Sequence, residues 1–219
     1  MNSKRNLKVA TALFVTVALL DIIAIVTERE ALRYFFKPMV IFSLALLYWL
    51  SSTSKNKWYL MALSGSFLGD VFLLFEGQLY FMLGLGSFLL AHLFFIKIVF
   101  NTLTKPKLNT VLLSAVVFSA FLLVLLYILG SHTGNLLIPV MVYGLVISSF
   151  GCISLISYLN LKSKASLMLF FGALVFIFSD TLLAFNKFVN PIEFLDIVIM
   201  GSYIVAQYII FRAVLLAEK

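Results

Sequence analysis

Long apolar runs alternate with short polar segments along the whole chain. A transmembrane helix needs about 20 mostly apolar residues, with a range of about 17–25. The 219-residue chain contains eight runs of this kind, at 7–26, 38–53, 58–75, 78–100, 109–130, 136–159, 166–186 and 192–215. The second run is short, and the third and fourth are joined by a tight turn at Glu76-Gly77. The pattern predicts an all-α fold, a polytopic membrane bundle of eight transmembrane helices.

Composition places the chain in the same class. Hydrophobic residues make up 63% of the chain and charged residues only 11%, whereas soluble domains carry roughly 25% charged residues. We therefore expect one transmembrane domain over residues 1–219 and a multi-pass integral membrane protein. The single cysteine, Cys152, excludes an internal disulfide and a cysteine-based metal cluster.

The net charge of +7 raises the possibility of a nucleic-acid partner. The basic residues, however, lie in short segments between apolar runs, which is the pattern that sets membrane orientation. We therefore expect no nucleic acid.

One side of the predicted bundle carries 12 basic residues: Lys4, Arg5, Lys8, Lys55, Lys57, Lys97, Lys105, Lys107, Lys162, Lys164, Arg212 and Lys219. The other side carries the remaining four of the 16, which are Arg29, Arg33, Lys37 and Lys187. Basic residues favour the cytoplasmic side, so both termini are predicted in the cytoplasm. If the chain is bacterial, the predicted location of the protein is the cytoplasmic membrane.

The two halves of the chain resemble each other. Asp70 and Asp180 each follow a small residue in an apolar run that ends in phenylalanine. Two further pairs of segments match in the same order, 86–92 with 201–207 and 38–42 with 139–143. This indicates a tandem four-span duplication, with halves at approximately 1–105 and 106–219, like the parallel repeats of some transporters. The alternative is chance similarity between apolar segments.

Asp70 and Asp180 are the strongest candidates for chemistry. A carboxylate in the middle of a membrane span costs about 2.5–3.5 kcal/mol on insertion scales, so it calls for a reason. Both aspartates lie roughly 18–21 Å along spans that run in the same direction, which predicts a shared depth and one acidic site. Two close carboxylates do not both ionise easily, so the site would hold an acid and a base together. The alternative is that each carboxylate only accepts hydrogen bonds between helices.

Five further polar residues are candidates for substrate binding. His92 and Gln207 occupy equivalent places in spans four and eight, and Tyr143 and Tyr203 have hydroxyls that can point inward. Lys37 is predicted at the outer interface, where a lipid phosphate lies. For each, an ordinary structural role is the alternative, including an interfacial anchor for Lys37. Asp21 and Glu76 are expected to be solvated.

Metal chemistry has weak support in the sequence. The chain has no H-E-x-x-H motif and no Cys/His spacing typical of zinc sites. A site built from Asp70, Asp180 and His92 is the one metal alternative, and no metal is predicted.

At these residues the chain resembles the YhhN-type lysoplasmalogenase family of integral membrane proteins. The resemblance covers nearly the whole chain and rests on Lys37-Pro38, Leu68-Gly69-Asp70, the segment from Phe88 to His92, Tyr143, the segment 171–184 around Asp180, and Tyr203 with Ala206-Gln207. It implies eight spans, no cofactor or metal, and hydrolysis of the vinyl ether bond of lysoplasmalogens. The products would be a fatty aldehyde and glycerophosphoethanolamine or glycerophosphocholine.

Under this resemblance the partners are a lysophospholipid substrate and membrane lipid. One aspartate would protonate the vinyl ether and the other would stay ionised, but the sequence does not indicate which aspartate has which role. It does not indicate the oligomeric state either. The rival class is a proton-coupled small-molecule or lipid transporter, because midmembrane carboxylates in parallel repeats also suit a carrier. A third alternative, a structural or sensor protein, predicts that both aspartates tolerate replacement by asparagine.

Overall fold

The computed structural model describes residues 2–218, with side chains from residue 5 onward. Within this part all elements of secondary structure are helices, and the eight-helix prediction is confirmed. The helices are α1 (Asn2–Val26), α2 (Glu30–Ser51), α3 (Lys57–Phe72), α4 (Gln78–Thr102), α5 (Leu108–Leu129), α6 (Leu137–Leu161), α7 (Lys164–Phe188) and α8 (Glu193–Ala217), with a short 3-10 turn, η1 (Gly134–Leu136).

Seven of these helices are long and apolar enough to cross a membrane, all except α3. In a bilayer, backbone N–H and C=O groups must be paired within the protein, which makes helices the natural form of such apolar runs. α3 has only 16 residues, and the chain continues beyond it in hydrogen-bonded turns, such as that from the Phe75 N–H to the Phe72 carbonyl at 3.1 Å. Gly77 then reverses the chain with φ +105°, as the predicted turn requires.

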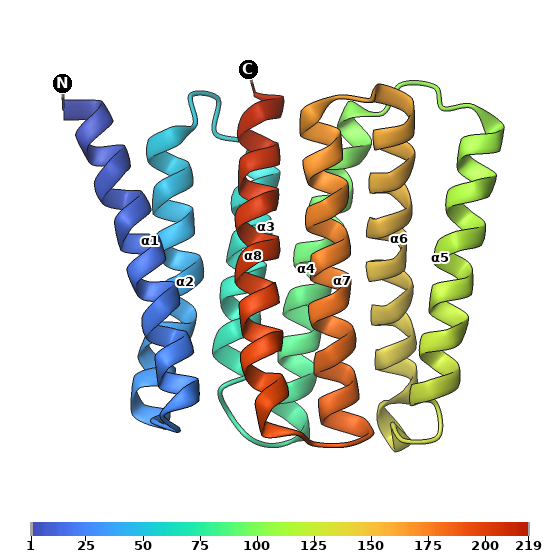
Figure 1. Ribbon diagram of the computed structural model, residues 1–219. Coiled ribbons are helices and arrows are strands. Elements are labelled where there is room, and N and C mark those ends of the chain that lie inside the picture. The colour runs from blue at the N-terminus through green and yellow to red at the C-terminus, as the bar shows by residue number, and fades with distance from the viewer. Residues whose placement is uncertain (1, 219) are drawn as a thin grey trace.

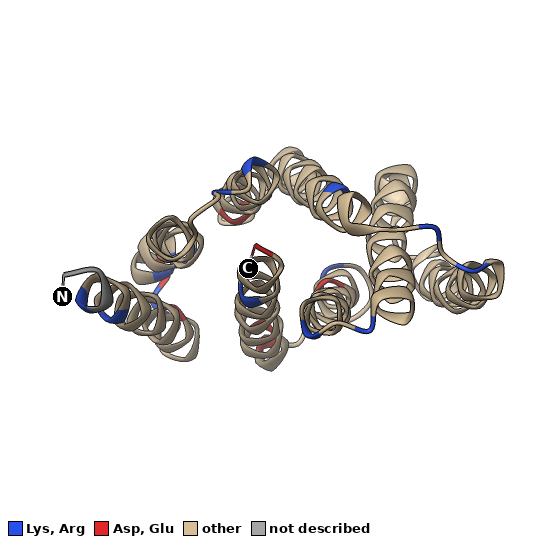
Figure 2. Ribbon diagram, turned by 90° about the horizontal axis from the view of Figure 1, so that it is seen from above, with Lys and Arg blue, Asp and Glu red and all other residues tan. Residues whose placement is uncertain are grey.

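Six helices form a ring, and two pack on its outside (Figures 1 and 2). In ring order these are α2, α3, α4, α6, α7 and α8, with α8 returning to pack on α2. α1 packs against α2 and α8 on one side, and α5 packs against α6 and α7 on the other. Residues that point into the ring are therefore enclosed by protein, whereas the outward faces are available to lipid.

The ring has the pairing that a tandem repeat would give. Helices two, three and four of each half are consecutive in the ring, and the halves meet through the corresponding contacts α4–α6 and α8–α2. α3 and α7, which carry the two aspartates, therefore hold equivalent places. The duplication and its boundaries at 105 and 106 nevertheless stay a prediction.

The second helix begins earlier than predicted. α2 starts at Glu30 and runs through Pro38, which was expected to open the span. Proline lacks a backbone N–H and disfavours a helical residue before it, but tertiary packing can override that preference. In consequence Lys37 lies inside a helix and is buried, not at a helix end on the interface.

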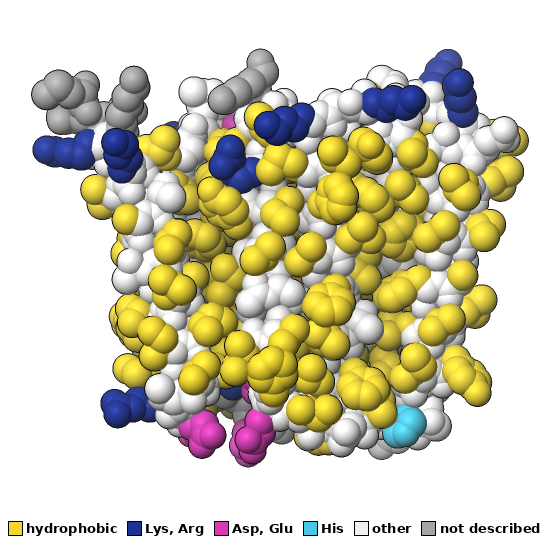
Figure 3. Space-filling model, in the orientation of Figure 1, with side chains coloured by type: hydrophobic (Ala, Val, Ile, Leu, Met, Phe, Trp, Pro, Cys, Tyr) yellow, Lys and Arg dark blue, Asp and Glu magenta, His cyan; other side chains and the backbone are white. Residues whose placement is uncertain are grey.

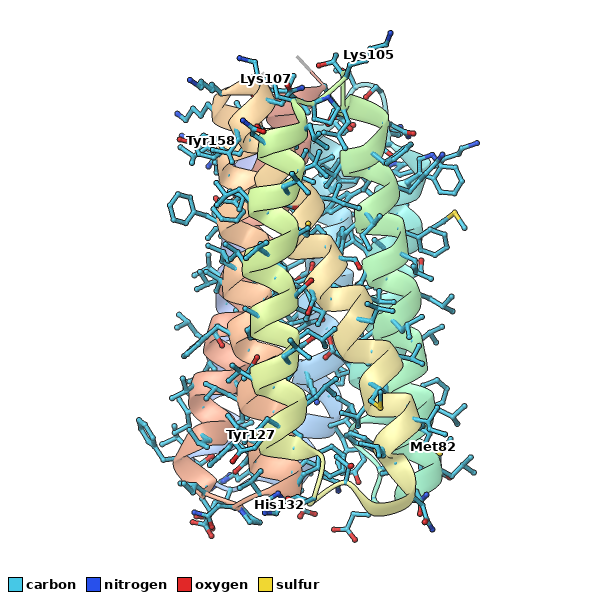
Figure 4. The ribbon with its side chains drawn as sticks, turned by 90° about the vertical axis from the view of Figure 1, so that its right-hand side faces the viewer. Met82, Lys105, Lys107, Tyr127, His132 and Tyr158 are labelled. Atoms are coloured by element: carbon cyan, nitrogen blue, oxygen red, sulfur yellow. The ribbon has the colours of Figure 1, made fainter. Side chains whose placement is uncertain are left out.

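Charge divides the two ends of the bundle as expected. The N- and C-terminal ends of the chain lie together at the top of Figure 1. In Figure 3, Lys and Arg line that upper edge, apolar side chains cover the middle, and acidic and basic side chains mix along the lower edge. Figure 4 places Lys105 and Lys107 at the upper end and His132 at the lower end. The Lys4 side chain and Lys219 lie outside the described residues.

Glycine permits a close approach between α3 and α4. A Cβ added at Gly65 would lie 2.9 Å from the Ser87 carbonyl oxygen and 3.1 Å from the Ala91 nitrogen, so a larger residue would meet backbone. Gly86 and Gly201 do not serve the same purpose, because nothing lies within 4 Å of a Cβ at either position. Gly86 is on the exposed side of α4.

Candidate active site

Asp70 is held deep in the ring by a tyrosine from the other half of the chain. It lies in the last turn of α3 and is 2% exposed. The Tyr203 hydroxyl on α8 donates to Asp70 Oδ2 at 2.8 Å. Gln207, one turn further along α8, donates from Nε2 to Ser66 Oγ at 3.0 Å and to the Tyr203 hydroxyl at 3.4 Å. This chain of bonds fixes the orientation of the carboxyl group.

Asp180 has the same kind of partner. It lies on α7, which begins with a capping box between Ser163 and Ser166, a device that stabilises a helix start. The Tyr143 hydroxyl on α6 donates to Asp180 Oδ2. Each aspartate thus accepts a hydrogen bond from one tyrosine, and the two pairs bring together α3 with α8 and α6 with α7.

A shared aromatic cluster joins the two pairs. The Phe176 ring lies 4.6 Å from the His92 ring and 5.4 Å from the Tyr203 ring, measured between centroids. The His92 ring is in turn 5.7 Å from the Tyr143 ring. The sequence-predicted residues Asp70, Asp180, His92, Tyr143, Tyr203 and Gln207 therefore belong to one cluster.

His92 does not hydrogen-bond to either aspartate. Its Nδ1 pairs with the Phe88 carbonyl oxygen one turn earlier, at 2.8 Å. Its Nε2 is buried and has no partner within the described residues. The Gln207 Oε1 atom is in the same condition. Unpaired buried polar atoms are costly, so these two atoms are available to a water or a substrate hydroxyl.

An apolar cavity leads to Asp180. It lies among α4, α5, α6 and α7 and is partly open to the surroundings. Asp180 and Tyr143 are among its lining residues, and the rest are mostly Leu, Ile, Val, Phe and Ala. Asp70 does not line the cavity, but Phe88 does, and the Phe88 ring packs edge-on against Tyr203 at 5.8 Å. The cavity suits an alkyl or alkenyl chain with its polar end at Asp180.

Lys37 lies on α2, toward the end of the ring that is away from the two termini. It is 8% exposed and lines a second pocket together with Arg33 and Lys187. Sequence reasoning used Arg33 and Lys187 only to assign orientation. One signal could have identified them as site residues. They lie near the ends of α2 and α7 that are away from the termini, and these helices carry Lys37 and Asp180.

Asp21 on α1 departs from expectation. It was expected to be solvated, but it is 0% exposed, and neither carboxyl oxygen has a hydrogen-bond partner in the described part of the chain. The charges of Lys37 and Arg33 act on it. The packing of α1 against α2 encloses it beside these cations. Glu76, in contrast, is exposed as expected.

No group of three or more His, Cys, Asp or Glu side chains among residues 2–218 is arranged to hold a metal ion. The site offers instead two carboxyls, two hydroxyls, an amide and an imidazole. This set can donate and accept protons and can orient a water molecule.

Comparisons with known proteins agree with this picture. The model of the YhhN family matches residues 32–214. The chain is 31% identical over 163 residues to mouse lysoplasmalogenase TMEM86B, covering 74% of this chain and 65% of that protein. It is 33% identical over 163 residues to a lysoplasmalogenase of Mycobacterium bovis, covering 71% and 59%.

A third relative is human lysoplasmalogenase TMEM86A, 31% identical over 157 residues, covering 66% of this chain and 60% of that protein. The chain spans 59% to 65% of the length of these three curated relatives. No solved structure matches the chain significantly. The family match covers α3, α7 and every residue of the aspartate cluster, and the chain is a multi-pass integral membrane protein that belongs to the YhhN family.

Proposed function

We propose that the chain is a membrane-embedded hydrolase that cleaves the vinyl ether bond of lysoplasmalogens. The products are a fatty aldehyde and a glycerophospho-alcohol. Family membership and relatives named lysoplasmalogenase support this activity. The observation that carries the proposal is the pair of tyrosine-bound carboxyls, one of which stands at the polar end of an apolar cavity.

The reaction needs an acid and a base at fixed places. A proton added to the β-carbon of the vinyl ether leaves an oxocarbenium ion at the α-carbon. Water adds to that carbon and loses a proton to the base, and the resulting hemiacetal collapses. The bond between the α-carbon and the glycerol oxygen breaks as the hemiacetal hydroxyl loses its proton and becomes the aldehyde oxygen, and the glycerol oxygen takes up a proton. A neighbouring carboxylate stabilises the cation, as in glycosidases.

The cavity supports an assignment of the two roles. The β-carbon belongs to the hydrocarbon chain, so its proton should come from a carboxyl that lines the cavity proposed to hold the chain. Asp180 lines that cavity, and Tyr143 on Oδ2 leaves Oδ1 free to carry the proton. Asp70, which has Lys37 and Tyr203 as neighbours, acts as the carboxylate that stabilises the cation and deprotonates water.

The remaining candidates have positioning or binding roles. Tyr143 and Tyr203 orient the carboxyls, while His92 Nε2 and Gln207 Oε1 hold the water or the glycerol hydroxyl.

α7 is unbroken through Asp180, and carriers commonly use discontinuous helices at their sites, so nothing here favours the transporter alternative. The charge distribution supports cytoplasmic termini and an opening of the site toward the other side of the membrane.

Aldehyde release from lysoplasmenyl-ethanolamine by the purified full chain in detergent tests the proposal. We expect Asp70→Asn and Asp180→Asn to lower turnover to near background, and Glu76→Gln, an exposed loop carboxyl, to leave it unchanged. Hydrolysis in D₂O should place deuterium on the carbon next to the aldehyde, detected by trapping the product at once. Near-normal turnover in either asparagine variant would rule out the mechanism.

A further inference from the structure

Three cations gather around one pocket at the outer end of the ring. The pocket has an empty volume of about 740 Å³ and is lined by Arg33, Lys37 and Lys187, with Asn186 and one acidic residue, Asp196. The end of the bundle away from the termini has four basic residues among those described, and only Arg29 lies outside this pocket. The concentration of positive charge indicates an anionic ligand.

Lys37 has no anionic partner of its own. It is almost buried, yet it takes part in no hydrogen bond or ion pair within the described residues. The charged groups that act on it are Asp70, Arg33, Asp21 and Asp196, and none of the three carboxyls approaches within 4.0 Å. A buried charge without a partner is unfavourable. A bound anion would provide the missing partner.

Arg33 is held in place for such a contact. Its Nη1 lies 3.4 Å from Asp196 Oδ2, and Asn186 Nδ2 donates to Asp196 Oδ1 at 3.0 Å. The Arg33 Nε atom is buried and unpaired in the described part of the chain. The guanidinium group therefore keeps donors free, and such donors match the oxygens of a phosphate.

The basic pocket adjoins the apolar cavity. Both are lined by Leu73, Phe81 and Leu183, which therefore mark their junction. A lysophospholipid has the same order, a hydrocarbon chain, then a three-carbon glycerol, then a phosphate. With its chain in the apolar cavity, its ether bond would lie near Asp180 and its phosphate among the cations.

The groove beyond the pocket limits where a phosphate can go. Past Arg33 and Asp196 it is lined by Glu28, Glu30 and Glu193. These carboxyls repel a phosphate, whereas the ammonium of ethanolamine or choline is compatible with them. The phosphate position is therefore the basic pocket itself.

We infer that Arg33, Lys37 and Lys187 form a binding site for the phosphodiester of a lysophospholipid, next to the apolar cavity. The inference rests on the proposed function for the identity of the lipid, but its test does not require hydrolysis. Lys187 is exposed and packs over the Phe81 ring at 5.6 Å, so it can be replaced without opening the interior. Lys37 is unsuitable as the first test because its replacement would disturb the buried aspartates.

The experiment measures binding of lipids that cannot react. The full chain in detergent is titrated with a saturated-ether lysophosphoethanolamine, with the matching alkylglycerol that lacks phosphate, and with inorganic phosphate. We expect the phospholipid to bind about tenfold or more tightly than the alkylglycerol. Lys187→Gln and Arg33→Gln should each weaken phospholipid binding about tenfold and leave alkylglycerol binding unchanged. Arg29→Gln, on the same side but outside the pocket, should resemble the unmodified chain.

Three results would overturn the inference. The first is equal affinity for the two lipids, and the second is an equal loss in the Arg29→Gln variant, which would indicate general attraction to this face. Inorganic phosphate that binds as tightly as the lipid would mean that the pocket holds a free anion and not a lipid head group. Because no turnover is measured, active aspartate variants would refute the proposed mechanism and leave this site intact.

Discussion

Tyr203→Phe is the most informative single change, because it removes only the hydroxyl that donates to Asp70 and accepts a longer hydrogen bond from Gln207. The Tyr203 hydroxyl donates to Asp70 Oδ2 at 2.8 Å in a region closed to solvent. The ring packs edge-on against Phe88 and Phe176, at 5.8 Å and 5.4 Å, and phenylalanine keeps both contacts. The change therefore frees the Asp70 carboxyl without emptying space around it.

The magnitude follows from the kind of bond. Hydrogen bonds to charged groups contribute about 1.5–3 kcal/mol, and a buried acceptor left without its donor loses about that much. If the bond orients Asp70 in the transition state, kcat/KM should fall roughly 10- to 100-fold. The loss should be mainly in kcat, because Tyr203 is absent from the walls of the chain cavity. Aldehyde release across substrate concentrations separates the two constants.

Tyr48→Phe is the matched control. The Tyr48 hydroxyl bonds to Glu218 and accepts from the Asn56 backbone N–H at 2.6 Å, at the terminal end of the bundle. Both variants should lower the melting temperature in detergent, but only Tyr203→Phe should lower kcat. Unchanged kcat in Tyr203→Phe, or an equal fall in Tyr48→Phe, would refute the assigned role of Tyr203.

Three further predictions concern packing, the cavity and orientation. Gly65→Ala should lower the melting temperature by several degrees because its Cβ would meet the α4 backbone, whereas Gly86→Ala should leave it unchanged or slightly raised; equal effects would contradict the close approach of α3 and α4. Ala184→Phe should narrow the apolar cavity and raise KM more for long-chain than for short-chain substrates, and a uniform rise would mean that the chain binds elsewhere. A fluorescent protein fused to the C-terminus should fluoresce in a bacterial host and an alkaline phosphatase fusion should be inactive, while the reverse result would invert the assigned orientation.

The fold class could be predicted closely because the lipid environment leaves few options. Most predicted span boundaries agree with the helices to within about two residues, as for 109–130 against Leu108–Leu129. The exceptions arise where the bounds of a helix differ from the bounds of its apolar run. α2 extends back through the polar residues around Arg33, and its Pro38 is tolerated inside the helix. Hydropathy and proline rules both misplace such a start.

The candidate site was predicted in part. Asp70 and Asp180 stand out because a carboxyl in an apolar run is rare, and matching contexts linked them. Tyr143 and Tyr203 were also candidates, but the sequence did not indicate that they donate to these aspartates, since a tyrosine in an apolar helix is usually a packing residue. That Tyr203 and Tyr143 serve as donors depends on which helices face each other.

The sequence by itself determined the helical membrane architecture, the charge difference between the two ends and the choice of Asp70 and Asp180 as candidates. Each of these follows from local composition, because burial in lipid penalises every polar group without reference to its neighbours. Only the tertiary structure decided that Lys37 is enclosed, that Arg33 and Lys187 join it around one pocket, and that this pocket adjoins an apolar cavity. These are properties of side chains from helices distant in sequence, and the packing of the ring alone brings them together.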